Sequence, residues 1–270
     1  MKDIVFGQYI PAKSIIHRLD PRAKMIFLIA YIVLIFCTFN FYALAIPFVF
    51  AIIFMLLSGV RIKQYLKSLK MMIIVIVLTS VLNLFYGGGK VYLTLGPVSI
   101  TQGGINNSVF IVSRIVCLLI ASAALTFTTS PTELTDAIER LMKPLKIFHI
   151  KVHEIAMMMT IALRFVPTLL EETDKIMMAQ KARGADMESG GLVKRAKSLI
   201  PVLIPLFVSA FRRAFDLAMA MECRCYNGGK GRTKMKSLHM QGRDIAGFVI
   251  LGAIIAGIVL CNVFLPHTIK

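Results

Sequence analysis

Residues 25–59 read MIFLIAYIVLIFCTFNFYALAIPFVFAIIFMLLSG, a run without one charged side chain. An α-helix needs about 20 residues to cross a hydrocarbon core of about 30 Å, so this run is far too long for a single span. Asn40 lies near its middle, where a polar residue marks a tight turn. The run therefore predicts two short membrane-spanning helices, at about 25–39 and 43–59, joined as a hairpin.

The acidic residues divide the rest of the chain. Between Asp20 and Glu133 there is no Asp or Glu, and there is none after Asp244. Further apolar segments give about five predicted spans in all, the others being at 71–86, 105–128 and 244–265. We therefore predict an all-α polytopic membrane protein with an N-terminal membrane part (1–128), a charged cytoplasmic domain (129–243) and a C-terminal span (244–265).

Basic residues between the predicted spans give the orientation. Residues 1–24 hold five Lys or Arg and the segment 60–70 holds four, whereas the turn at 40–42 holds none and the segment 87–104 holds only Lys90. Because Lys and Arg are retained on the cytoplasmic side, the N-terminus and a loop at 60–70 are predicted to be cytoplasmic. Five spans then place the C-terminus outside. Residues 91–100 are predicted to form a small external hairpin that turns at Gly96-Pro97.

A sixth apolar segment at 198–211 is not predicted to cross. It is short, contains Pro201 and Pro205, and has basic clusters on both sides, one of which a span would have to place outside. We expect it to lie at or under the membrane surface.

The middle domain is predicted to hold three helices. Ser130 is a helix cap with Pro131 at the first helical position, which starts a helix that ends near residue 142. A long helix is expected from 152 to 182, interrupted by Pro167, and a third from about 192 to 225.

The ends of the two long helices resemble each other. One reads Ala182-Arg183-Gly184 and the other Cys223-Arg224-Cys225, so each carries one Arg in its last turn. A single basic residue there is explained by the helix dipole, which it stabilises by about 0.3–1 kcal/mol. Two such residues at two helix tips favour a designed contact, because the planar guanidinium binds carboxylates and carbonyls in a partner's groove.

Several stretches resemble the transmembrane (T) component of energy-coupling factor (ECF) transporters, which import vitamins and micronutrients. Asp20 and Pro21 are first of all a helix cap and a first-turn residue. Asp20-Pro21-Arg22 also lies in a motif before the first span, Ser130 and Pro131 start a motif of the first coupling helix, and Arg164 lies in a motif of the second. Ala182-Arg183-Gly184 matches the first of two Ala-Arg-Gly signatures. The second signature keeps only Arg224, so Asn227 and Gly228 are expected to supply the turn that a Gly would have made.

The resemblance implies a subunit that is not an enzyme. Two cytosolic ABC ATPase subunits would receive Arg183 and Arg224, and a separate substrate-binding membrane subunit, the S component, would bind the vitamin. ATP and Mg would belong to the ATPases, with no cofactor, metal or nucleic acid on this chain. Asp20, Pro21, Arg22 and Arg164 are further interface candidates. The expected location is the bacterial cell membrane. Which vitamin is carried, and by how many S components, is decided outside this sequence.

Other functions fit the residues less well. The permease of a conventional ABC importer is the nearest alternative, but it predicts one coupling element per chain rather than two. An intramembrane enzyme or a proton-coupled transporter needs ionisable groups in the bilayer, and the predicted spans before residue 244 contain no carboxylate. His149, His153 and Glu154 suggest a metal site only weakly. Arg114, the one charge inside a predicted span, is either a functional group or a partner for backbone carbonyls or the cytoplasmic domain.

Overall fold

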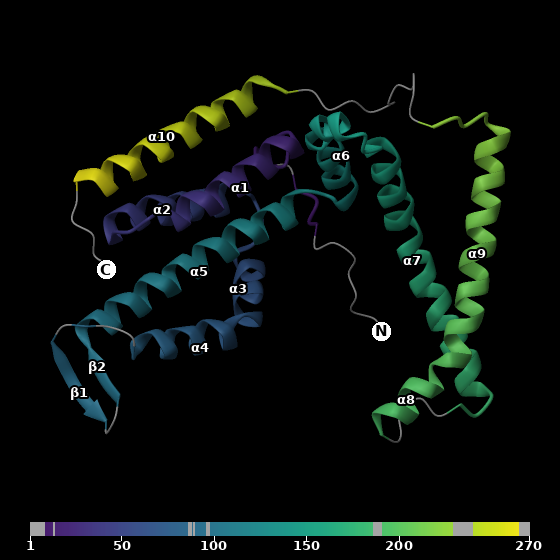
Figure 1. The fold of residues 1–270 in the computed structure, drawn as a ribbon, viewed down its shortest axis with the longest axis horizontal. Helices are drawn as coiled ribbons and strands as arrows, with labels where there is room; N and C mark the ends of the chain where they lie inside the picture. The colour runs from purple at the N-terminus through teal and green to yellow at the C-terminus, as the bar shows by residue number, and fades with distance from the viewer. Residues whose placement is uncertain are drawn as a thin grey trace. The chain divides into compact units, whose positions relative to one another are not determined.

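The computed structural model describes residues 9–12, 14–85, 88, 90–95, 98–185, 191–228 and 240–264 and is built mainly of helices (Figure 1). The order is α1 (Pro21–Phe36), α2 (Phe41–Leu57), α3 (Ile62–Met71), α4 (Ile73–Leu84), β1 (Val91–Leu95), β2 (Val98–Thr101), α5 (Gln102–Thr128), α6 (Pro131–Leu141), the 3-10 helix η1 (Lys143–Phe148), α7 (Val152–Ala182), α8 (Leu192–Ser198), α9 (Ile200–Cys223) and α10 (Gly242–Phe264).

The chain divides into two compact units. The first, which we call the membrane unit, comprises the described residues of 7–137 and 237–270. The second, which we call the middle unit, comprises the described residues of 138–236. The chain passes from one unit to the other within α6, so the middle unit is inserted in sequence between α5 and α10.

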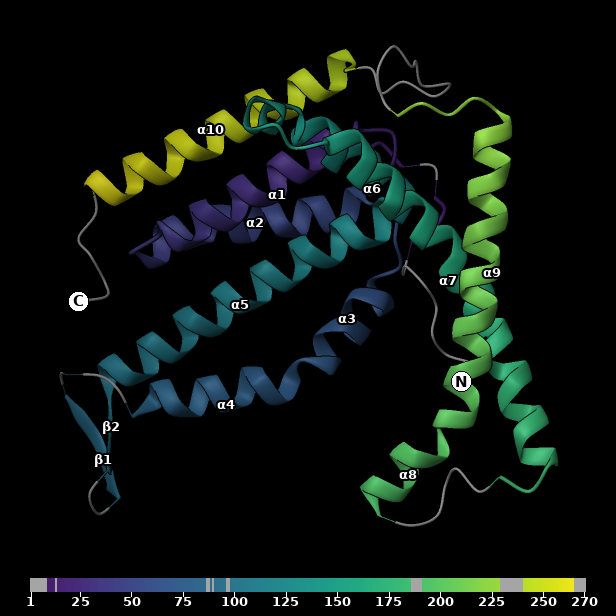
Figure 2. The ribbon, with the colours of Figure 1, turned by 45° about the vertical axis from the view of Figure 1, so that its right-hand side comes forward.

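In the membrane unit, α10, α1, α2, α5 and α4 lie side by side (Figures 1 and 2). Helix α5 packs against α4, α2 and α1, and α10 packs against α2 and α1. The core of this unit includes Tyr31, Ile35, Tyr65, Cys117 and Phe127, all almost fully buried. Some apolar residues of α5 thus lie in the core, and others lie on the surface of a helix that is long enough to cross a bilayer.

Among the described residues, four helices are long and apolar enough to cross a membrane, or up to five if the bent pair α3–α4 forms one span. This confirms the prediction of an all-α, multi-pass membrane protein, although α1 and α2, which cover the first two predicted spans, are shorter helices of 16 and 17 residues. The four are α5, α7, the segment Val193–Glu222 and α10, while α2 is apolar but shorter. Length and composition therefore do not separate the predicted cytoplasmic helices from the spans, and the exclusion of 198–211 from the membrane stays a prediction.

The predicted loop at 60–70 is wrong, because this segment forms α3. Apolar residues recur at Ile62, Tyr65 and Leu69, the spacing of one helix face. Tyr65 is buried and its hydroxyl donates a 3.0 Å hydrogen bond to Ser58 Oγ. A break at Met72 bends α3 by 60° from α4, so the predicted span at 71–86 is a helix of only twelve residues.

Two predictions about the long helices of the middle domain also need correction. Helix α7 runs without interruption through Pro167, because one missing backbone N–H removes a single hydrogen bond from a helix of 31 residues. The third predicted helix is in fact two, α8 and α9, with a break at Leu199. Pro201 then falls in the first turn of α9, where a backbone N–H has no partner within the helix.

The hairpin predicted at 91–100 is present, and its external position stays a prediction. Strands β1 and β2 pair antiparallel, with Leu93 opposite Ile100 and Leu95 opposite Val98. The turn at 96–97 lies outside the described residues.

In the middle unit, α7 and α9 pack against one another and run in opposite directions (Figures 1 and 2). His153 Nδ1 lies 3.0 Å from Glu139 Oε1, which joins the start of α7 to the end of α6. The structure therefore gives His153 a carboxylate partner from a neighbouring helix. No group of three or more His, Cys, Asp or Glu that could hold a metal ion occurs in the described part of the chain.

Candidate functional site

The tip of α7 ends in a Schellman motif. Arg183 is the C-cap, and the next residue, Gly184, has a left-handed φ of 88°. The Ala185 N–H donates to the carbonyl of Gln180, and the Gly184 N–H to that of Lys181. These two bonds satisfy carbonyls that the helix end would otherwise leave unpaired. The motif stops the helix immediately after Arg183 and leaves this side chain exposed.

The tip of α9 repeats this geometry. Arg224 is the C-cap, and Cys225 takes the left-handed position with φ 55°. The Tyr226 N–H donates to the carbonyl of Met221, and the Cys225 N–H to that of Glu222. The expectation that Asn227 and Gly228 make the turn is therefore wrong, because Cys225 makes it in spite of its Cβ. Arg224 is exposed, as Arg183 is.

The two tips thus present their Arg residues in equivalent backbone positions. Ala182 and Cys223 are the last helical residues, and the exposed guanidinium follows each at the C-terminal end of the helix dipole. Gly184 has no heavy atom within 4 Å of the place where a Cβ would lie, so its surroundings are open. An arginine at such an end can reach a groove on another protein without first breaking contacts of its own helix.

A polar cluster joins the two long helices where they cross. Glu172 of α7 accepts hydrogen bonds from the Ser209 hydroxyl and from Arg213 Nη2 of α9, the latter at 2.9 Å. The Arg213 and Glu172 side chains are partly exposed. The sequence analysis did not identify this cluster. One signal of the cluster was present in the sequence. Glu172 lies eleven positions before Arg183, and Arg213 lies eleven positions before its own tip residue, Arg224.

Arg164 lies in the first half of α7 and is exposed. It lies outside the Glu172 cluster and away from the tip at Arg183. The structure therefore does not bring Arg164 together with the other predicted site residues of α7.

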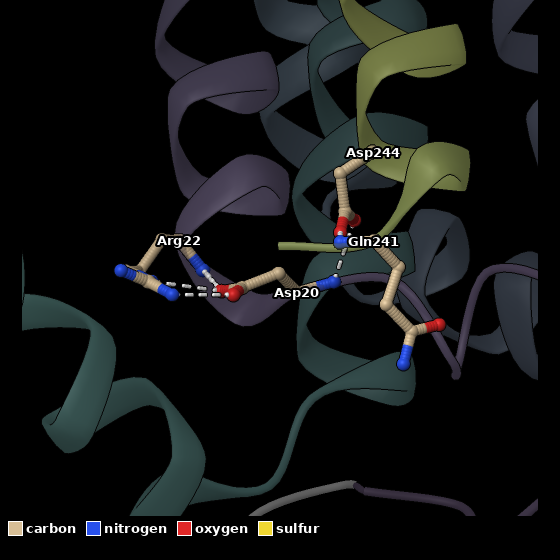
Figure 3. Close-up of polar contacts among 4 residues, drawn as sticks. All are labelled: Asp20, Arg22, Gln241 and Asp244. Carbon is tan, nitrogen blue, oxygen red and sulfur yellow. Dashed lines mark hydrogen bonds and ion pairs between the residues drawn. The ribbon is translucent and has the colours of Figure 1, made fainter. Parts of the chain in front are cut away.

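The remaining predicted site residues lie in the membrane unit, at the start of α1 (Figure 3). Asp20 caps this helix and accepts a 2.9 Å hydrogen bond from the Arg22 N–H, with Pro21 at the first helical position. This confirms the expected cap. Arg22 Nη2 also pairs with Asp20 Oδ2 at 2.8 Å. That hydrogen bond and the charge of Asp20 raise the pKa of Arg22.

Asp244 completes this arrangement, and sequence reasoning missed it. Figure 3 shows its carboxylate reaching the backbone that precedes α1. Asp244 Oδ1 accepts from the Asp20 N–H and Oδ2 from the Gln241 N–H, both at 2.8 Å. Asp244 is only 1% exposed. Asp20 and Asp244, both buried, thus hold two helix starts together, and the Arg22 side chain beside them is partly exposed.

Arg114 of α5 has a structural partner in the membrane unit. Its Nη2 donates a 2.7 Å hydrogen bond to the carbonyl of Thr38, which follows the end of α1. Its guanidinium also lies over the ring of Phe110, 4.8 Å from the centroid. Of the two alternatives for this charge, the structure shows pairing with a backbone carbonyl.

Comparison with known proteins identifies the family of this chain. A family model described as cobalt transport protein (CbiQ) matches residues 12–235. The chain is 52% identical over 260 residues to the energy-coupling factor transporter transmembrane protein EcfT of Thermosediminibacter oceani, covering 96% of this chain and 98% of the relative. It is 49% identical to the EcfT of Clostridium kluyveri (90% and 91% covered) and 49% identical to that of Brevibacillus brevis (96% and 98% covered). The chain belongs to the family of energy-coupling factor transporter transmembrane proteins.

Proposed function

We propose that this chain is the coupling subunit of an ECF-type importer and carries out no chemistry itself. Two cytosolic ATPase subunits would each receive one tip, with Arg183 in one and Arg224 in the other. The observation that carries the proposal is the shared Schellman geometry, which places an exposed Arg at the C-cap of both long helices. ATP and Mg would be held by the ATPases, and this chain would bind no cofactor.

The surface of α9 supports a second partner. Large apolar side chains are exposed along much of the helix, including Leu203, Ile204, Phe207, Val208, Phe211 and Phe215. An exposed apolar surface of this kind marks a protein or membrane contact. We propose that this face contacts the bilayer surface and a separate S component that binds a vitamin or other micronutrient. The two equivalent tips favour this function over that of a conventional importer permease.

The orientation follows from the same proposal. The middle unit would lie on the cytoplasmic side of the bacterial cell membrane, as would the N-terminus, so that the tips reach the ATPases. Helix α7 and the segment Val193–Glu222 would then lie outside the bilayer despite their length and composition.

The test is affinity purification of the tagged chain from its host membrane. Two ABC ATPases should co-purify, and a preparation without them would contradict the proposal. The variant Arg183→Glu with Arg224→Glu should lose both ATPases and vitamin uptake while still inserting in the membrane. A matched control, Lys194→Glu with Lys197→Glu, makes the same change of charge on the exposed helix α8 and should keep both ATPases.

A further inference from the structure

The cluster at the crossing of α7 and α9 lies at equivalent distances from the two tips. Glu172 precedes Arg183 by eleven residues, and Arg213 precedes Arg224 by eleven. At 1.5 Å per residue, each tip lies about 16 Å along its helix from the cluster. The contact between Glu172 and Arg213, at 2.9 Å, therefore marks the midpoint between the two arginines along this path.

The helices run in opposite directions at this crossing, which puts the tips at opposite ends of the pair. Gln180, near the end of α7, donates a hydrogen bond of 3.4 Å to the carbonyl of Pro201, near the start of α9. Glu172 instead meets Ser209 and Arg213, further along α9. Glu172 with Ser209 and Arg213 thus joins two antiparallel arms of equal length, and the Gln180 hydrogen bond joins them again nearer the tip of α7.

The cluster contributes more to geometry than to stability. Its Arg213 side chain is 43% exposed, and exposed ion pairs contribute little to stability. The apolar contacts between the two helices have little directional preference, so on their own they leave the register less well defined. A carboxylate that accepts from two side chains of the facing helix fixes one register without locking the helices together.

We propose that Glu172 is a positioning residue, the pivot about which α7 and α9 turn when the two ATPase subunits approach each other. The proposal rests on the function proposed above. Because the arms are equal, turning each helix through the same angle about Glu172 displaces Arg183 and Arg224 by equal amounts. A pair of equivalent ATPase subunits related by a two-fold axis would make this movement, with the axis passing near Glu172 and Arg213.

The neighbouring residues offer matched controls. Glu171 and Arg212 have the same charges as Glu172 and Arg213, are exposed, and lie next to them in sequence but outside the cluster. The test uses the whole complex with its co-purifying ATPases and S component, reconstituted in liposomes. Uptake and ATP hydrolysis are measured together, alongside the yield of complex.

Glu172→Arg should lower uptake per ATP hydrolysed by about fivefold, the effect of a coupling energy near 1 kcal/mol, while the complex still assembles. Glu171→Arg should leave that ratio unchanged. Glu172→Arg with Arg213→Glu restores opposite charges at the crossing and should recover the ratio, whereas Glu172→Arg with Arg212→Glu should not.

Three outcomes would overturn the pivot: equal effects of Glu172→Arg and Glu171→Arg, no recovery in the exchanged pair, or loss of the complex in Glu172→Arg. Two other results would contradict the proposed coupling function rather than the pivot. Either the unaltered chain captures no ATPase, or the variant Arg183→Glu with Arg224→Glu still captures both ATPases.

Discussion

The backbone N–H of Asp20 donates a 2.8 Å hydrogen bond to the carboxylate of Asp244, 224 positions later in the chain. The same carboxylate accepts from the Gln241 N–H at the start of α10. One buried side chain thus satisfies backbone donors in two distant segments. It fastens the beginning of the first helix of the membrane unit to that of the last.

Removal of this carboxylate should loosen the membrane unit. Asp244→Ala leaves the N–H groups of Asp20 and Gln241 without acceptors, and a buried unsatisfied donor costs about 1–3 kcal/mol. We expect a lower midpoint of thermal unfolding for the detergent-purified protein. Asp216→Ala, an exposed position on α9, should unfold at the same temperature as the unaltered chain. Equal midpoints for the two variants would contradict the role of Asp244.

Close packing between α4 and α5 depends on the absence of a side chain at Gly104. A Cβ there would overlap the carbonyl oxygen of Leu84, a backbone atom that cannot rotate away. Gly104→Ala should therefore destabilise the protein by about 1–3 kcal/mol, the usual cost of overpacking. Gly252→Ala in α10 adds the same methyl group where no heavy atom lies within 4 Å, so it should be tolerated. A comparison of the midpoints of thermal unfolding of Gly104→Ala and Gly252→Ala tests this prediction.

Gly184 and Cys225, the residues with a left-handed φ at the two tips, should respond to substitution with opposite changes in helix stability. A residue with a Cβ costs roughly 1–2 kcal/mol in this conformation. Cys225→Gly should stabilise the last turn of α9, whereas Gly184→Ala should destabilise that of α7. Hydrogen exchange of the amide protons in each last turn measures both effects. Cys225→Gly should also retain uptake, and its loss would show that the thiol has a role beyond the turn.

The start of α6 should depend on a reciprocal cap. The Glu133 N–H donates to Ser130 Oγ at 3.3 Å, and the Ser130 N–H donates to Glu133 Oε2 at 3.4 Å. Ser130→Ala should cost about 0.5–2 kcal/mol, because the Glu133 N–H loses its acceptor. Ser130→Thr keeps the hydroxyl and serves as control. If chemical denaturation showed the Ala and Thr variants to be equally stable, the cap would contribute nothing measurable.

Local signals in the sequence predicted much of the fold. The bounds of α7, 152–182, followed from the pattern between its flanking residues, and the caps at Asp20 and Ser130 followed from their own side chains and Pro at the next position. These features depend on neighbours within a few residues. The periodicity of Ile62, Tyr65 and Leu69 was equally local, but the segment had been interpreted only as a carrier of positive charge.

Other features depended on contacts or energies that no local pattern contains. Cys225 in a left-handed conformation opposes its intrinsic preference, so the sequence predicted a later turn at Asn227 and Gly228. The bond between Asp20 and Asp244, and the cluster of Glu172 with Arg213, join residues that only the tertiary structure brings together. For the site, the sequence located the two arginines at the tips but not the crossing that lies midway between them.

The fastening by Asp244 also imposes an order on synthesis. A ribosome that adds 5–20 residues per second needs about 10–45 s to proceed from Asp20 to Asp244. During that interval the N–H of Asp20 lacks its native acceptor, while the whole middle unit is being made. Helix α10 then emerges last and packs against α1 and α2, which were synthesised first. The membrane unit therefore reaches its native contacts only after the residues inserted within it have left the ribosome.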